Sequence, residues 1–265
     1  AKDNIRGVRN FLMHRPQYLR KSFHLKNEVV SARLYITAKG VFDAHINGKD
    51  ISDDLLSPGW TPYNHRIETL TYDVTDLLKS KENVLAVELA SGWHSGRISR
   101  GKAPYKKFTS PKILCQLEIT FNDGSKQTIL SDESWKGTTN GPISLASIYD
   151  GETYDANLEM PNWTTIHFND ASWINTETQD LSENIKLAPK RHLTVKNKLV
   201  LEDVEIVSTQ NNSTIFNVKQ NMVGVPKIKV PMKKGDTLKI RFSEMLLNDN
   251  TFYTTNYRSA KSTDY

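Results

Sequence analysis

The chain has 265 residues, of which 37% are hydrophobic, and its 35 basic and 30 acidic residues give a net charge of +5. A mean hydropathy of −0.54 favours a β-rich protein with many turns over a helical one. The basic residues are scattered, whereas a nucleic-acid-binding protein usually concentrates them on one face or arm. The single cysteine excludes an internal disulfide framework. No apolar run approaches the ~20 residues of a membrane span, and no signal peptide is recognised at the start of the sequence.

Alternating apolar and polar residues predict strands along the first half of the chain. Residues 34–38 and 41–46 have a period of two, and Asn47–Gly48 favours a hairpin turn because both residues tolerate a positive φ. Residues 73–83 predict a helical turn that leads into a strand over 83–90. A second hairpin is predicted at 115–130, where Asn122, Asp123 and Gly124 form the turn. Its first strand contains Cys115, which we interpret as a small core residue.

The polar segment after Trp173 has little periodicity and reads as a connection between two modules. We predict a first β-sandwich over residues 1–180, a linker over 181–197 and the start of a second β-sandwich over 198–265. Closely spaced turn signals favour antiparallel, jelly-roll-like sandwiches over parallel α/β units. The second sandwich is expected to be cut short, because no closing strands follow its predicted strands at 198–208, 213–220, 226–232 and 236–246.

An acidic stretch, "SIYDGETYDANLE" at 147–159, is the most conspicuous candidate site. If it is extended, Asp150, Glu152 and Tyr154 share one face, with Asp155 on the other. Carboxylates two residues apart lie about 6.5–7 Å from each other, within the ~6.5–9.5 Å of an inverting glycosidase. Catalytic acids must flank the scissile bond, however, and neighbours on one strand point the same way. Such a pair suits calcium or sugar hydroxyls better, and a purely structural role at the edge of the sandwich stays open.

Other chemistry-bearing patterns are weaker. The seven histidines form no zinc-binding motif, and "GWHSGRISRG" lacks the lysine and hydroxyl residue of a phosphate-binding loop. Trp60 and Trp93 follow glycines at predicted strand ends, where an aromatic ring can stack on a sugar. Core packing is nevertheless the favoured interpretation for both, and contact with a sugar is the alternative. Trp135, Trp163 and Trp173 are interpreted as core or loop residues.

The order of the motifs resembles the N-terminal region of bacterial α-L-rhamnosidases, glycoside hydrolase family 78. The resemblance covers residues 17–265 and is carried by "SPGWTPYNHR" (57–66), "SGWHSGR" (91–97), "YDGETYDA" (149–156), "FNDASW" (168–173) and "KQNMVGV" (219–225). The family's motif in the second sandwich usually reads "DFGQNMAGW". Residues 217–225 read "NVKQNMVGV", so the acid, the first glycine and the tryptophan are replaced.

The resemblance implies that "YDGETYDA" belongs to a non-catalytic domain. The family's catalytic acids lie in an (α/α)6 barrel downstream of both sandwiches, so we expect no catalytic residue in this chain. The expected parent enzyme hydrolyses terminal α-L-rhamnosyl residues of a glycan with inversion, in the bacterial periplasm, at the cell surface or after secretion. This part would support the barrel. A stand-alone carbohydrate-binding module and a structural or dimerisation spacer are the alternatives.

Some family members bind rhamnose with the help of calcium through a related sandwich. No cofactor is expected to be required here, although the resemblance leaves calcium open. We expect any sugar or calcium site to involve a set of six residues: Asp150, Glu152, Asp155, Trp60, Tyr63 and Asn64.

Overall fold

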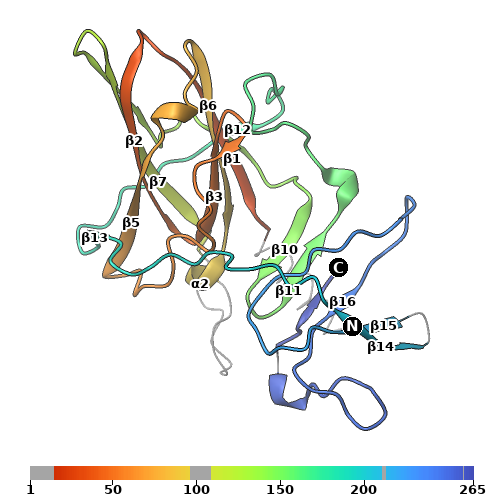
Figure 1. The fold of residues 1–265 in the computed structure, drawn as a ribbon. Coiled ribbons are helices and arrows are strands. Elements are labelled where there is room, and N and C mark those ends of the chain that lie inside the picture. Colours follow the sequence, from red (N-terminus) through yellow and green to blue (C-terminus); the bar gives the residue numbers. More distant parts are fainter. Residues whose placement is uncertain (1–14, 96–108, 211–212, 259) are drawn as a thin grey trace.

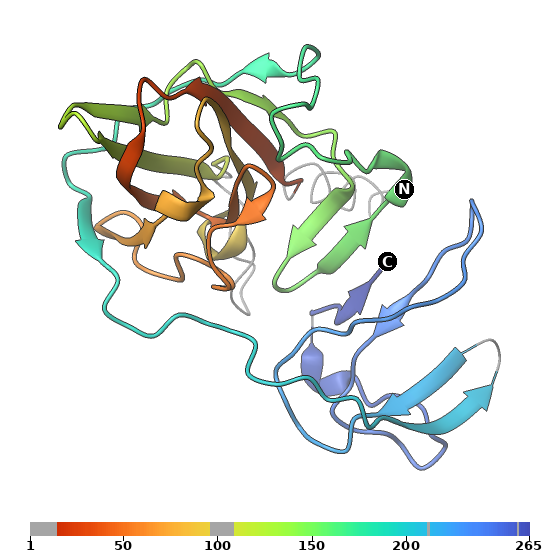
Figure 2. The same ribbon diagram turned by 45° about the horizontal axis from the view of Figure 1, so that its top comes forward.

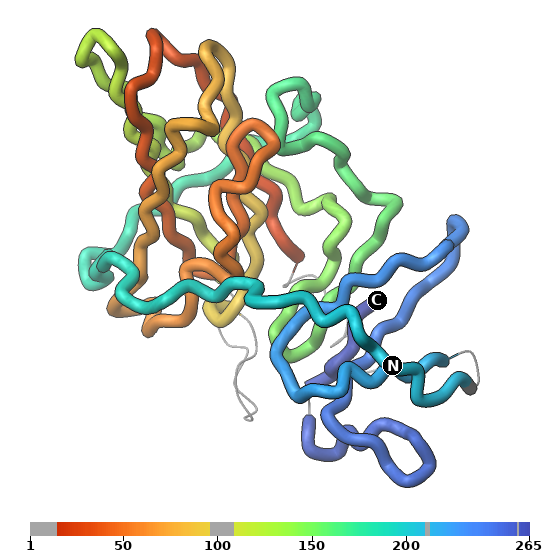
Figure 3. The backbone as a smooth tube through the Cα atoms, in the orientation of Figure 1, coloured from red at the N-terminus to blue at the C-terminus, as the bar shows by residue number. Residues whose placement is uncertain are grey.

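The computed structural model describes residues 15–95, 109–210, 213–258 and 260–265. Their regular structure is almost entirely β-strand, which confirms the all-β prediction. No helix in these ranges is long and apolar enough to cross a membrane. We call residues 15–196 the first module and residues 205–265 the second module; Figures 1 and 3 show the chain passing from one to the other.

The first module is a sandwich of two sheets, visible as two layers in Figure 1. One sheet has six strands in the order β12-β9-β1-β6-β3-β4, and the other has five in the order β13-β5-β2-β7-β8. The strands of the six-stranded sheet are β1 (Gln17–His24), β3 (Val41–Ile46), β4 (Lys49–Asp50), β6 (Glu82–Ala90), β9 (Lys136–Thr138) and β12 (Ile174–Asn175). Those of the five-stranded sheet are β2 (Val29–Lys39), β5 (Arg66–Asp73), β7 (Lys112–Phe121), β8 (Lys126–Leu130) and β13 (Lys186–Pro189).

The core lies between these two sheets. In β2, the alternate residues Leu34 and Ile36 point inward and are essentially inaccessible to solvent. β6 and β7 contribute Leu85, Leu89 and Leu117 to the same cluster. Burying a side chain of this size stabilises the fold by about 1.5–3 kcal/mol. Cys115 is buried in β7, as the sequence predicts, and burial raises the pKa of its thiol to about 12.

Both predicted hairpin turns form. Asn47 and Gly48 have φ values of 54° and 83°, as a tight turn after β3 requires. The Asn47 side chain also donates to the Asn83 side chain at 2.7 Å. Gly124 closes the second turn with a φ of 77°. The helical turn predicted before β6 is η1 (Thr75–Leu77).

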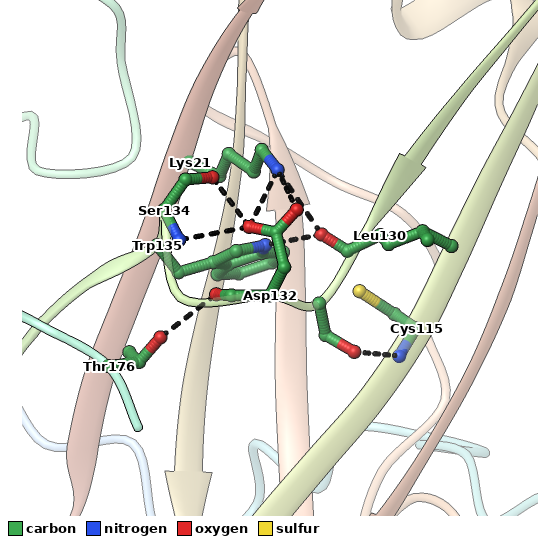
Figure 4. A network of polar contacts seen from close by, with 8 residues as sticks. Lys21, Cys115, Leu130, Asp132, Ser134, Trp135 and Thr176 are labelled. Atoms are coloured by element: carbon green, nitrogen blue, oxygen red, sulfur yellow. Dashed lines mark hydrogen bonds and ion pairs between the residues drawn. The ribbon is translucent and has the colours of Figure 1, made fainter. Parts of the chain in front are cut away.

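A polar network fixes the turn between β8 and β9 (Figure 4). The Asp132 carboxylate accepts hydrogen bonds from Lys21 Nζ at 2.7 Å and from Ser134 Oγ at 2.5 Å. The indole of Trp135 is 1% exposed and donates to the Leu130 carbonyl at 2.8 Å. The network satisfies the polar atoms of a turn that inserts a tryptophan into the core, and so links both sheets.

The segment from Met160 to Trp173 covers the outer face of the six-stranded sheet. Trp163 packs edge-on against Tyr18 of β1, with ring centroids 5.3 Å apart. Arg20, also in β1, is 2% exposed; it pairs with the Asp170 carboxylate and donates to the Thr165 carbonyl at 2.7 Å. Trp163 and Trp173 therefore pack over this face, as interpreted from the sequence.

The region predicted as a linker contains a strand. β13 (Lys186–Pro189) pairs in parallel with β5, and the Lys190 amide donates to the Thr69 carbonyl at 2.9 Å. The chain stays attached to the first module as far as Val195, which forms a bridge with Leu55. The linker prediction for 181–197 is therefore wrong for this edge strand, and the sandwich is not purely antiparallel.

The second module is assembled from short strand pairs. β14 (Glu205–Gln210) pairs with β15 (Ser213–Asn217), and β16 (Ile240–Arg241) pairs with β17 (Thr263–Asp264). No strand is assigned over 226–232, so that prediction is wrong, and only part of 236–246 is strand. Phe216 is 57% exposed and Val225, at the position of the family's tryptophan, is 80% exposed. Apolar side chains in this module thus face solvent more than those of the first.

Candidate functional site

The acidic stretch forms a hairpin next to the six-stranded sheet. Its strands are β10 (Ile143–Ser147) and β11 (Gly151–Tyr154), and they form a separate antiparallel pair. Gly151 has a φ of 80°, so the chain turns at residues 148–150 and is not extended there. The expectation that Asp150 lies on one strand face with Glu152 and Tyr154 is therefore wrong.

Asp150 belongs to the turn and is 7% exposed. Its carboxylate accepts from Ser147 Oγ at 3.4 Å, and its amide donates to the same hydroxyl oxygen at 3.1 Å. These contacts hold the turn together. The Asp150 side chain is thus largely withdrawn from solvent rather than presented to a ligand.

Asp155 caps the short helix η2 (Ala156–Leu158). Its Oδ1 accepts from the Asn157 amide at 3.0 Å and from Asn157 Nδ2 at 2.8 Å. The hydrogen bonds from the Asn157 side chain and backbone lower the pKa of Asp155. Such a cap is a common use of aspartate at the start of a helical turn, and the second acid of the candidate set is engaged in local structure.

Glu152 lies where the two modules meet. Its amide donates to Asp264 Oδ1 in the second module at 2.7 Å. Burial, and after it the charge of Asp264, raises the pKa of the Glu152 carboxyl. Burial is also the main cause that raises the pKa of Glu88 in β6 to about 7, and the charges of Asp43 and then of Glu152 contribute. This is a junction between modules that concentrates negative charge.

The aromatic part of the candidate set lies on the loop between β4 and β5. Trp60 is 62% exposed, so the core-packing interpretation is wrong for this tryptophan. Tyr63 is 8% exposed and donates from its hydroxyl to the Gly59 carbonyl at 3.1 Å. Asn64 is exposed beside it. The loop thus fixes Tyr63 internally and presents Trp60 and Asn64 to solvent.

Tyr63 is held by a small apolar cluster at the same end of the sandwich. Ile67 and Ile185 form the cluster with it, and Trp93 packs against them. His94 in α2 (Gly92–Ser95) lies edge-on to Tyr63, with ring centroids 5.1 Å apart. Burial lowers the pKa of His94 to about 4, with a further contribution from Lys39 and Lys112. His94 is thus a neutral packing residue near neutral pH.

The six candidate residues fall into two groups on separate elements, the β10–β11 hairpin and the loop before β5. The acids do not form a shared metal cage, since Asp155 caps η2 and Asp150 holds its own turn. Within the described ranges, no group of three or more histidine, cysteine, aspartate or glutamate residues is placed to hold a metal ion. The residues therefore do not fit calcium as a set, and calcium binding stays a prediction.

Two features of this region were missed in the sequence. Asp43 of β3 and Tyr18 of β1 lie opposite Glu88 across the sheet, so three polar side chains form one row. Polar residues inside otherwise apolar strand patterns were the available signal. The contact between Glu152 and Asp264, which are 112 residues apart, had no signal in the local pattern.

Comparison with known proteins defines the class of this chain. Residues 27–198 match the model of the α-L-rhamnosidase N-terminal domain, and residues 207–265 match that of the bacterial α-L-rhamnosidase concanavalin-like domain. The chain belongs to the α-L-rhamnosidase N-terminal domain family. An α-L-rhamnosidase of Formosa agariphila is 60% identical over 264 residues, which are 100% of this chain and 28% of that protein.

Solved structures extend the likeness to both modules. The Streptomyces avermitilis α-L-rhamnosidase complexed with L-rhamnose is 34% identical, with a TM-score of 0.85. That match covers 95% of this chain and 24% of the other. The α-L-rhamnosidase of Aspergillus terreus is 37% identical with a TM-score of 0.84, covering 95% and 29%. The chain thus spans roughly a quarter of the proteins that it resembles.

Proposed function

We propose that this chain is the non-catalytic N-terminal part of an α-L-rhamnosidase and that it supports the catalytic region. The observation that carries the proposal is the match of both modules at a TM-score of 0.85, over 95% of this chain but only 24% of the related enzyme. The proposed parent acts on a rhamnose-containing glycan in polysaccharide degradation. We place it in the bacterial periplasm, at the cell surface or outside the cell, and no cofactor is required.

In the proposed parent, a general acid protonates the leaving oxygen while a general base activates water on the opposite face of the sugar, which inverts the anomeric centre. Both groups belong to the downstream (α/α)6 barrel. The candidate acids of this chain have other roles: Asp155 caps a helix and Asp150 holds a turn. Glu152 lies at the module junction, where its backbone amide donates to the Asp264 carboxylate.

The test is an activity assay of the purified 265-residue chain with an aryl α-L-rhamnoside. We expect no release of the aryl group above the rate in buffer. Release that disappears in Glu152→Gln, while Asp155→Asn retains it, would show that the hairpin is catalytic and overturn the proposal. Circular dichroism of all three proteins checks that the variants are folded.

Carbohydrate binding is a second candidate function, favoured by the exposure of Trp60. Trp60 and Asn64 are both exposed on a loop that Tyr63 anchors in the apolar cluster, so the loop offers solvent an aromatic ring and an amide. Stacking on an aromatic ring is a general way to hold the apolar face of a sugar. Calorimetry with L-rhamnose, with calcium and then with a chelator, tests this function. Saturable heat that Trp60→Ala abolishes supports binding, and no heat in either condition leaves a spacer role.

A further inference from the structure

The two modules are joined by backbone pairing between distant segments. The Tyr265 amide donates to the Glu152 carbonyl at 2.9 Å, and the Tyr154 amide donates to the Tyr265 carbonyl at 2.8 Å. Tyr265 therefore bonds to both neighbours of Thr153, which is the pattern of parallel strands. Closer to the hairpin turn, the Lys261 amide donates to the Tyr149 carbonyl at 2.9 Å, one residue out of this register.

This pairing merges two small sheets into one ribbon across the module boundary. β10 pairs with β11, the 261–265 segment lies along β11, and β17 in that segment pairs with β16. Figure 2 shows the C-terminal strand beside the hairpin, although the chain between them runs through the whole second module. The Glu152 amide, bonded to the Asp264 carboxylate at 2.7 Å, adds a charge-assisted hydrogen bond to the ribbon.

Gly151 is the point of closest approach. A Cβ atom built there would clash with the Thr263 carbonyl oxygen and would lie only 2.8 Å from Asp264 Oδ1. Its φ of 80° already favours glycine. The glycine in "YDGETYDA" is thus required twice, first by its own backbone and second by the strand of the other module that passes over it.

By contrast, the covalent connection between the modules is weakly held. In the 197–204 connection every residue is exposed except the half-buried Leu201. A backbone hydrogen bond within this connection is internal, from the Val204 amide to the Glu202 carbonyl. A segment with few buried contacts opens at low free-energy cost. The orientation of the second module relative to the first must therefore be fixed by contacts outside this connection.

We propose that the ribbon is a strand latch: pairing of 261–265 with 149–154 holds the second module in one orientation against the first, and breaking it frees the second module to move about residues 197–204. The edge of the hairpin thus binds one kind of partner, an extended strand. This strand passes over Gly151 and places a carboxylate against the Glu152 amide. This inference assigns a role to the acidic stretch that does not depend on rhamnosidase activity.

The test compares Gly151→Ala with Gly124→Ala in the 265-residue chain. Gly124 has nearly the same φ, 77°, but an added Cβ meets nothing within 4 Å, so this variant reproduces the backbone strain alone. We expect Gly151→Ala to lower the hydrogen-exchange protection of the Tyr154 and Tyr265 amides at least tenfold. The radius of gyration from small-angle X-ray scattering should also rise. Gly124→Ala should change neither, and β6 amides should stay protected in both.

Equal protection and equal radius in the two glycine variants would overturn the latch. If Gly151→Ala also lowers the hydrogen-exchange protection of the β6 amides, the first module itself has opened. The variant Asp264→Ala then tests the latch instead. That variant removes the acceptor of the Glu152 amide from the other side of the junction. We expect at least threefold lower hydrogen-exchange protection of the Glu152 amide in Asp264→Ala. Asp249→Ala is the control and should show no such loss, because the Asp249 carboxylate accepts from Thr251 in its own turn. Unchanged protection in Asp264→Ala would refute the proposal.

Discussion

Replacing Asp170 with alanine should destabilise the first module strongly. Arg20 is the most deeply buried charged side chain of the outer sheet face, 2% exposed, and the Asp170 carboxylate is its counter-charge. Removing one partner of a buried pair costs about 3–5 kcal/mol, because the other charge is left without compensation. The lower end applies here, since Arg20 keeps its bond to the Thr165 carbonyl and Asp170 is 21% exposed.

A loss of about 3 kcal/mol corresponds to a fall in melting temperature of roughly 6–12 °C for a domain of this size. Differential scanning calorimetry and urea unfolding of wild type and variant measure it. Lys136→Met is the matched control, because Lys136 also pairs with Asp170, at 2.7 Å, but is 37% exposed. Exposed pairs contribute about 0–1 kcal/mol.

The double variant Arg20→Met, Asp170→Ala separates the charge from the packing. If the uncompensated arginine causes the loss, removing it as well should recover part of the stability, since replacing a buried pair with apolar residues is often tolerated. An Asp170→Ala loss no larger than that of Lys136→Met would refute the reasoning. So would a double variant that is less stable than Asp170→Ala alone.

Three further predictions concern other parts of the chain. Burial raises the pKa of Glu88 to about 7 from its ordinary 4.5. The folded state therefore disfavours the charged form, and its stability falls as the pH rises between these two values. Glu88→Gln should remove most of this fall in melting curves recorded from pH 4 to 8. Asp132→Ala should cost about 1–3 kcal/mol, because Lys21 and Ser134 lose their common acceptor, and an unchanged urea midpoint would contradict the role of the network in Figure 4. Trp60→Ala should change the unfolding free energy by less than about 0.5 kcal/mol, because the ring is 62% exposed; a larger cost would mean that it packs in the fold.

Local signals in the sequence predict much of the first sandwich. Period-2 alternation fixes the inward residues of β2 and β7, and Asn47 and Gly124 mark turns that form where predicted. These features depend on residues close together in the chain, so their pattern is readable. The resemblance to rhamnosidases depends on the order of motifs along nearly the whole chain, and the comparisons confirm it.

The features that failed depend on tertiary contacts. β13 is a strand because β5 offers it a free edge, and its own sequence has no strand pattern. Asp150 leaves the strand face because Gly151 adopts a positive φ. Glu152 meets Asp264 across 112 residues. A pattern of carboxylates gives their spacing along the chain but does not show which segment of another module packs against them.

The central claim is that the acidic stretch serves the structure while the chemistry lies elsewhere in the parent protein. The most direct measurement is a heteronuclear NMR titration of the chain with L-rhamnose, first with calcium and then with a chelator. The account predicts no saturable shift at the amides of residues 150–155, and it assigns any shift to the Trp60 loop. Saturable, calcium-dependent shifts at Asp150, Glu152 and Asp155 would contradict it, because the hairpin would then be a sugar site.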